Sequence, residues 1–157
     1  MEQIYCCLWQ DAKRKAQQVI TPERAEALHR VGEPYTVVFY VQNRVRYAVT
    51  VSRNGVTVRF YDSEQMPESY YEYQPADADR MFLRKVIRFV CEEQKITHKI
   101  VYDYDPRCIL TKTDCDLIEN TKNVSEMTVD LKNNWERFPE FEDYDHLLVM
   151  RSDLPTI

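Results

Sequence analysis

Residues 34–62, PYTVVFYVQNRVRYAVTVSRNGVTVRFYD, contain three runs of β-branched and aromatic residues separated by two turn sequences. Such residues are typical of strands, and Asn54-Gly55 between two alternating runs is a strong signal for a β-hairpin. The alternation places Val49 and Val51 on one face of the second run and Thr50 on the other. The stretch therefore predicts an antiparallel meander over about residues 35–61, with an apolar face that the rest of the chain must cover.

The strongest helical pattern lies in residues 80–94, which follow a capping aspartate, Asp77 or Asp79. Apolar side chains recur there at helical spacing, namely Phe82, Val86, Phe89 and Val90. We expect this helix to lie across the apolar face of the meander. On that packing, Phe89→Ala would cost roughly 3 kcal/mol or more.

Other segments predict smaller elements around the meander. Thr21 and Pro22 signal the start of a helix that ends near Gly32. Residues 11–18, 114–120 and 143–151 fit further helices, and residues 99–102 and 126–131 fit short strands. The predicted fold class is therefore α+β, a single domain over residues 1–157. An antiparallel meander with additional short strands packs against two to four helices.

Length and composition place the chain among globular proteins. It has 157 residues, of which 44% are hydrophobic and 30% charged. No apolar run approaches the roughly 20 residues that a membrane helix needs, and the first residues lack the basic-then-apolar order of a secretory signal. Five cysteines, an odd number, fit reduced thiols. These features predict a cytoplasmic protein that does not bind membranes.

The sequence contains no recognisable catalytic or cofactor motif. Only Gly32 and Gly55 occur in the chain, which excludes glycine-rich phosphate loops, so we expect no catalytic residue, bound metal or cofactor. An alternative rests on Asp103-Tyr104-Asp105 and on the similar triplet 114–116. Two carboxylates on one face of a strand can hold Mg²⁺, so this alternative predicts a metal-dependent enzyme.

Charge is segregated along the chain, whose net charge is −5. Residues 62–79 contain six acidic and no basic residues, and residues 100–157 contain thirteen acidic against six basic residues. Aromatic residues gather in both segments. Carboxylates attract basic proteins and repel nucleic acids, while tyrosine and tryptophan supply rigid anchors. The predicted partner-binding residues are Glu68, Tyr70, Tyr71, Glu72, Tyr73, Asp103, Tyr104, Asp105, Trp135, Glu140, Phe141, Glu142, Asp143 and Tyr144.

In size, acidity, aromatic content and scarcity of glycine, the chain resembles the immunity proteins of bacterial polymorphic and contact-dependent toxin systems. The resemblance implies a non-catalytic protein that neutralises one cognate toxin by covering its active site or an adjoining surface. The expected partner is thus a basic protein, a toxin effector domain, and not a nucleic acid. Besides the metal-dependent enzyme, a subunit of a larger assembly is the other alternative, and it predicts an oligomer.

Overall fold

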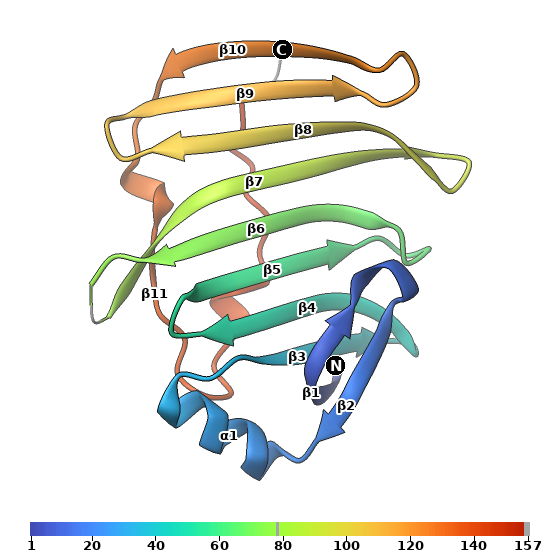
Figure 1. Cartoon of the computed structure of the whole chain (residues 1–157), viewed down its shortest axis with the longest axis vertical. Coiled ribbons are helices and arrows are strands. Elements are labelled where there is room, and N and C mark those ends of the chain that lie inside the picture. Colours follow the sequence, from blue (N-terminus) through green and yellow to red (C-terminus); the bar gives the residue numbers. More distant parts are fainter. Residues whose placement is uncertain (78, 156–157) are drawn as a thin grey trace.

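The computed structural model describes residues 1–77 and 79–155, and these residues form one antiparallel sheet of eleven strands with one α-helix (Figure 1). The strands are β1 (Glu2–Gln10), β2 (Lys15–Ile20), β3 (Tyr35–Val41), β4 (Arg44–Ser52), β5 (Gly55–Tyr61), β6 (Pro67–Pro75), β7 (Arg80–Glu92), β8 (Lys95–Asp105), β9 (Ile109–Asp116), β10 (Thr121–Thr128) and β11 (Trp135–Arg137). The helix is α1 (Pro22–Val31).

The sheet is a long meander with one rearrangement. From β3 to β10 each strand pairs with the next one in the chain, while the β1–β2 hairpin joins the sheet on the other side of β3. The two edges are consequently β10 and β2, and the short β11 pairs with one end of β7. Register shifts after Phe39, Phe60, Glu72 and Val90 mark β-bulges, which bend and twist strands.

The predicted meander is confirmed, because β3, β4 and β5 pair in sequence. The turn between β4 and β5 differs in detail from the expected one. Its loop residues are Arg53 and Asn54, and only Gly55, with φ 136°, has the positive φ expected of both Asn54 and Gly55. Positive φ at two successive loop residues, as in a type I′ turn, occurs instead at Gln42–Asn43.

The predicted helix over residues 80–94 is wrong. These residues form β7 and its turn into β8, with φ of 50° at Glu93 and 61° at Gln94. Both faces of β7 carry apolar side chains, since Leu83 and Val86 lie in the core while Ile87 faces away from it. Apolar residues on both faces produce continuous runs that also match a helical spacing.

The α+β class with two to four helices is therefore also wrong, because the described residues form a mostly β fold with a single α-helix. That helix is the one expected after Thr21, whose Oγ1 accepts a hydrogen bond from the backbone N–H of Arg24. It ends as expected at Gly32, with φ 76°. Residues 11–18 form a 3₁₀ turn and β2, residues 114–120 a strand end and turn, and residues 143–151 an irregular segment around a short 3₁₀ turn.

The C-terminal segment, residues 129–155, crosses one face of the sheet, and we call it the strap (Figure 1). Its Leu131, Tyr144, Leu147 and Leu154 share one hydrophobic core with side chains of the sheet. We call the sheet face under the strap the covered face. Its buried side chains include Tyr35, Val37, Val49, Val58, Tyr71, Leu83, Val86, Tyr102 and Leu110. The strap thus takes the place of the predicted covering helix.

Arg151 fastens the strap to the sheet. Its guanidinium donates hydrogen bonds to Asn134 Oδ1 at 2.9 Å and to both carboxylate oxygens of Asp153, and it lies over the ring of Tyr104. Its backbone N–H donates to the hydroxyl of Tyr71 at 2.7 Å. These contacts hold the end of the strap against β6 and β8.

A second, smaller core lies on the opposite side of the sheet, under the β1–β2 hairpin. It contains Trp9 and Tyr61 together with Cys6, Val38, Val45 and Ala48. Trp9 donates an indole N–H bond to the Tyr61 hydroxyl at 2.8 Å. The hairpin therefore shields the β3–β5 end of this side, and the strands beyond it have no such cover in the described chain (Figure 1).

Candidate functional site

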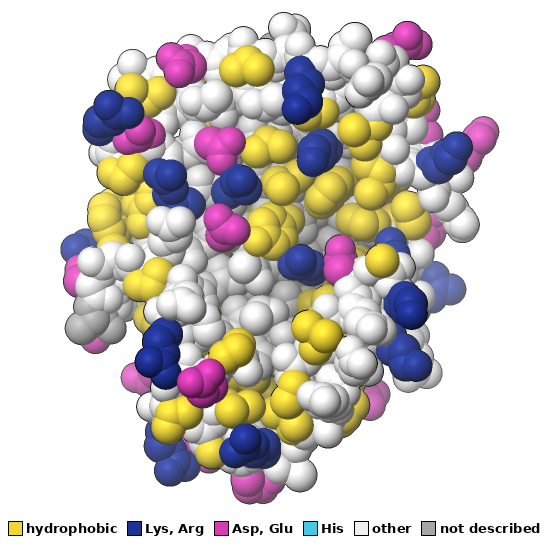
Figure 2. Space-filling model, viewed as in Figure 1, with side chains coloured by type: hydrophobic (Ala, Val, Ile, Leu, Met, Phe, Trp, Pro, Cys, Tyr) yellow, Lys and Arg dark blue, Asp and Glu magenta, His cyan; other side chains and the backbone are white. Residues whose placement is uncertain are grey.

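The side of the sheet opposite the strap carries the candidate site. We call its β5–β10 portion the open face, and Figure 2 shows it with hydrophobic side chains gathered over β7 and β8. Because paired residues of neighbouring strands share a face, the strand register groups its side chains into rows that cross the strands. The central row consists of Val124, Thr113, Val101, Ile87, Tyr70 and Arg59.

The central row is apolar across most of its width. Four of its six members have large apolar or aromatic side chains, and Val124 is 62% exposed. The solvent-exposed face of an antiparallel sheet usually carries polar residues, which alternate along each strand with the apolar residues of the covered face. An apolar row on a face without cover is the kind of patch that marks an interaction site.

Two further rows flank the central row with charges. One, which we call the acidic row, consists of Glu126, Thr111, Asp103, Lys85 and Glu72. The other, the lysine row, consists of Lys122, Cys115, Lys99 and Phe89. The apolar centre is thus bordered by three carboxylates and one lysine on one side and by two lysines and a phenyl ring on the other.

Local bonds hold the acidic row in place. Lys85 Nζ lies 3.6 Å from an oxygen of Asp103, and the Tyr70 hydroxyl donates to Glu72 at 3.0 Å. Burial, with the hydrogen bond to Glu72 adding to it, raises the pKa of Tyr70 to about 12. Tyr70 therefore remains a neutral hydrogen-bond donor at physiological pH.

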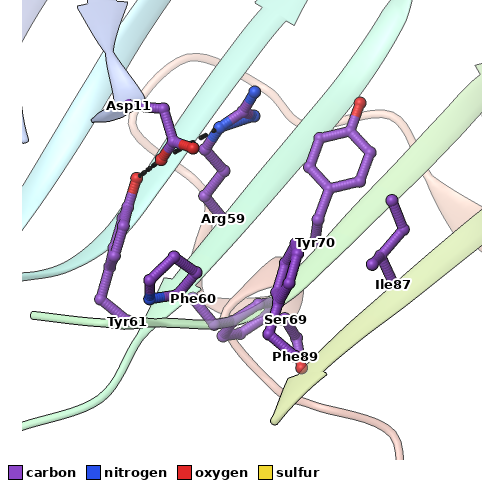
Figure 3. Close-up of a pocket in the computed structure, with 9 residues that line it drawn as sticks. Asp11, Arg59, Phe60, Tyr61, Ser69, Tyr70, Ile87 and Phe89 are labelled. Atoms are coloured by element: carbon purple, nitrogen blue, oxygen red, sulfur yellow. Dashed lines mark hydrogen bonds and ion pairs between the residues drawn. The ribbon is translucent and has the colours of Figure 1, made fainter. Parts of the chain in front are cut away.

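A hollow of about 190 Å³ lies where the open face meets the turn after β1 (Figure 3). Asp11 reaches into it from that turn, and Arg59 and Tyr70 come from the sheet. Its apolar lining includes Phe60, Pro67, Ile87 and Phe89. This volume suits a single side chain of a partner rather than a drug-sized ligand, whose pockets are larger.

The polar groups of the hollow form one connected set. Arg59 Nε lies 3.5 Å from Asp11, and its guanidinium carbon lies 4.9 Å from the centre of the Tyr70 ring. The hydroxyl of Tyr61 donates to the same carboxylate of Asp11. Burial is the main cause that raises the pKa of Tyr61 above its ordinary value. A carboxylate and a guanidinium are thus presented beside an apolar floor.

The structure divides the fourteen predicted partner-binding residues among three places. Tyr70, Glu72 and Asp103 lie on the open face, with Glu68 and Asp105 half-buried on the same two strands. Four rings, those of Tyr71, Tyr73, Tyr104 and Tyr144, are buried in the core. Trp135, Glu140, Phe141, Glu142 and Asp143 belong to the strap, on the other side of the sheet.

The two acidic segments therefore do not combine into one surface. Several of their carboxylates are also held by neighbouring arginines, as Asp105 is by Arg107 at 2.7 Å and Asp143 by Arg137 at 2.7 Å. These hydrogen bonds lower the pKa of both carboxyl groups. Trp135, 42% exposed, packs its ring on Phe82.

Sequence reasoning missed most of the open face. The helix expected over residues 80–94 places Ile87 and Phe89 in a buried layer, and the sequence gives Val101 and Lys99 no site role. The available signal was the alternation of Lys85, Ile87 and Phe89 with Val86 and Arg88. It becomes visible only when residues 80–94 are treated as a strand.

The two Asp-x-Asp triplets lie on opposite sides of the sheet. Asp103 faces the open side, whereas Asp114 pairs with Ile100, whose side chain packs against the covered-face core. Within residues 1–77 and 79–155, no group of three or more histidine, cysteine, aspartate or glutamate residues is arranged to hold a metal ion. None of the helical residues described forms a segment long and apolar enough to cross a membrane.

Comparison of the chain with protein-family models, with curated proteins and with solved structures finds no match.

Proposed function

We propose that this chain is a protein-binding module and that its partner docks on the open face. The observation that carries the proposal is the apolar central row, which spans β6, β7, β8 and β10 with no cover from the described chain. Burying such a row against a partner would contribute about 25 cal/mol per Å² of apolar surface before the costs of association. The hollow beside Arg59 would take one anchoring side chain of the partner.

The partner that fits this face is a protein with an apolar patch bordered by basic groups. Those groups would meet Glu72, Asp103 and Glu126 of the acidic row, and the net charge of −5 would attract a basic protein over longer distances. In its specific form, the proposal is a cytoplasmic immunity protein that neutralises a basic toxin domain without catalysis. Docking then involves only a minority of the residues expected from the acidic segments.

Binding of a purified basic toxin domain, starting with any encoded beside the gene for this chain, tests the proposal by calorimetry. Ile87→Glu and Phe89→Ser should each weaken binding by roughly 30-fold, because Ile87 lies in the central row and Phe89 lines the hollow beside it. Val149→Glu is the matched control, since Val149 is an exposed apolar residue of the strap. It should leave the affinity within about twofold.

The opposite pattern would overturn the choice of face. If Glu140→Lys and Glu142→Lys abolish binding while Ile87→Glu does not, the acidic strap is the docking surface. An affinity that does not fall as salt rises would contradict the basic partner, because steering by exposed charges weakens at high ionic strength.

A further inference from the structure

The β10 edge of the sheet is long, regular and exposed. All eight residues of β10 pair with β9 without a register shift, and the other side of β10 has no partner in the described chain. Seven of the eight residues are exposed, and none is proline. Such an edge presents unpaired backbone N–H and C=O groups, which readily pair with another strand.

The opposite edge is built differently. In β2 the register with β1 is unshifted but lacks a pair between Cys7 and Gln18, and Gln18 has a φ of 57°. A residue with positive φ departs from the extended backbone, so it makes an edge strand a less regular template for further pairing. Only β10 therefore offers a regular template at an edge of the described sheet.

We propose that β10 pairs antiparallel with β10 of a second copy of this chain, about a two-fold axis at Val124. In this register Val124 meets its own symmetry mate, and Lys122 of each copy faces Glu126 of the other. These three side chains share the open face. On the covered face Asn123 would lie opposite Ser125, and Thr121 opposite Met127.

Charge complementarity selects this register. Residues that pair directly across two antiparallel strands have their side chains on the same face of the sheet. The nearest alternative registers therefore place the two-fold axis at Asn123 or at Ser125. In either one, each residue of β10 faces a residue two positions away from its partner in the proposed register. With the axis at Asn123, Lys122 would face Val124. With the axis at Ser125, Val124 would face Glu126, so only the axis at Val124 opposes the lysine and the glutamate. Opposite charges on directly paired positions stabilise a sheet, and like charges destabilise it.

The two-fold axis runs perpendicular to the sheet, so both open faces lie on the same side of the joined sheet. The central rows then meet at Val124, where one apolar row continues into the other. A C₂ arrangement closes on itself and leaves no free β10 edge. The inference stands on the edge strand and does not depend on what binds the open face.

Charge exchange tests the pairing, with the mass in solution measured by light scattering at tens of micromolar protein. The wild-type chain should have about twice its monomer mass of 18.9 kDa. Glu126→Lys and Lys122→Glu place like charges opposite each other, and each should weaken dimerisation roughly tenfold or more. Combining both substitutions restores opposite charges and should restore the dimer. Glu93→Lys, in the turn between β7 and β8, makes the same change of charge away from the β10 edge and should leave the dimer intact.

A cysteine cross-link tests the register. In a background with Cys7→Ser and Cys108→Ser, which removes the exposed thiols, Val124→Cys should give a disulfide-linked dimer under mild oxidation. Thr128→Cys, four residues from the proposed axis, should not. A monomeric wild-type chain would overturn the proposal, as would failure of the doubly exchanged variant to dimerise while its circular dichroism remains native. Either result would leave binding at the open face as a separate question.

Discussion

Gly55 occupies a position that only glycine fits. Its φ of 136° lies outside the range that other residues adopt readily, and a Cβ added there would lie 2.3 Å from the backbone oxygen of Tyr73. The strands β5 and β6 thus approach each other at the point where the meander turns. A side chain at position 55 would clash with backbone atoms, so the backbone would have to move, whereas a clash with a flexible side chain could be relieved by rotation.

We therefore expect Gly55→Ala to lower the free energy of unfolding by roughly 3 kcal/mol, from strain together with the clash. Gly32→Ala is the matched control at the other glycine of the chain. Its φ is 76°, and the added Cβ would meet the Cβ of Arg53 at 3.0 Å, so a loss of roughly 1–2 kcal/mol is expected. Urea unfolding monitored by fluorescence measures both. Equal losses would contradict the close approach of β5 and β6.

At the scale of elements, β7 shows why the covering layer could not be predicted. Its apolar residues serve two environments, since Val86 is fully buried under the strap while Ile87 lies half-buried on the open face. A run with apolar residues on both faces has no clear period, and the turn at Glu93–Gln94 lacks the glycine or asparagine that usually announces a hairpin. The sequence could therefore not separate this hairpin from a helix.

Elements with local signals were predicted well. The meander carries its own alternation, and α1 carries a threonine cap, a proline at its first position and a glycine after its end. The sequence of the strap has no regular hydrophobic period. The spacing of its few buried residues depends on the irregular path that the strap takes across the sheet. The open face follows from β7 and β8 being strands, so the error over residues 80–94 also concealed the site.

The face on which each residue of β7 lies leads to a contrast in stability. Leu83 is 1% exposed in the covered core, and Leu83→Ala should cost roughly 3 kcal/mol. Phe89 lies half-buried on the open face, so Phe89→Ala should cost only about 1 kcal/mol, far less than a buried helical position would. Chemical denaturation of both variants measures the difference. A loss of 3 kcal/mol or more for Phe89→Ala would instead place that ring in a core.

At the scale of the whole molecule, the two sides of the sheet have different origins. The covered face is completed by the last residues of the chain, so it forms only when long-range contacts between the strap and the meander are made. The open face has no such closure in the described chain, although the same local hairpins build both faces of the sheet. Its apolar row is therefore the part of the sheet that a partner could still cover.

The strap should consequently unfold together with the sheet and not as a loose tail. Tyr144 carries this coupling, since its hydroxyl shares a hydrogen bond of 2.8 Å with that of Tyr35, which in turn bonds His29 Nδ1 at 2.8 Å. Tyr144→Phe removes one buried hydrogen-bond partner and should cost about 1 kcal/mol, whereas Tyr144→Ala also leaves a cavity in the core and should cost roughly 4 kcal/mol.

Two tryptophans allow this coupling to be measured, because Trp135 lies in the strap, whereas Trp9 belongs to β1 and contributes to the smaller core. If the strap completes the core, single-tryptophan versions of Tyr144→Ala should report the same, lowered urea midpoint at both sites. A lowered midpoint at Trp135 with an unchanged one at Trp9 would mean that the strap detaches from an intact sheet. The covered face would then expose its apolar side chains as the open face does, and the distinction between the two sides of the sheet would lose its physical basis.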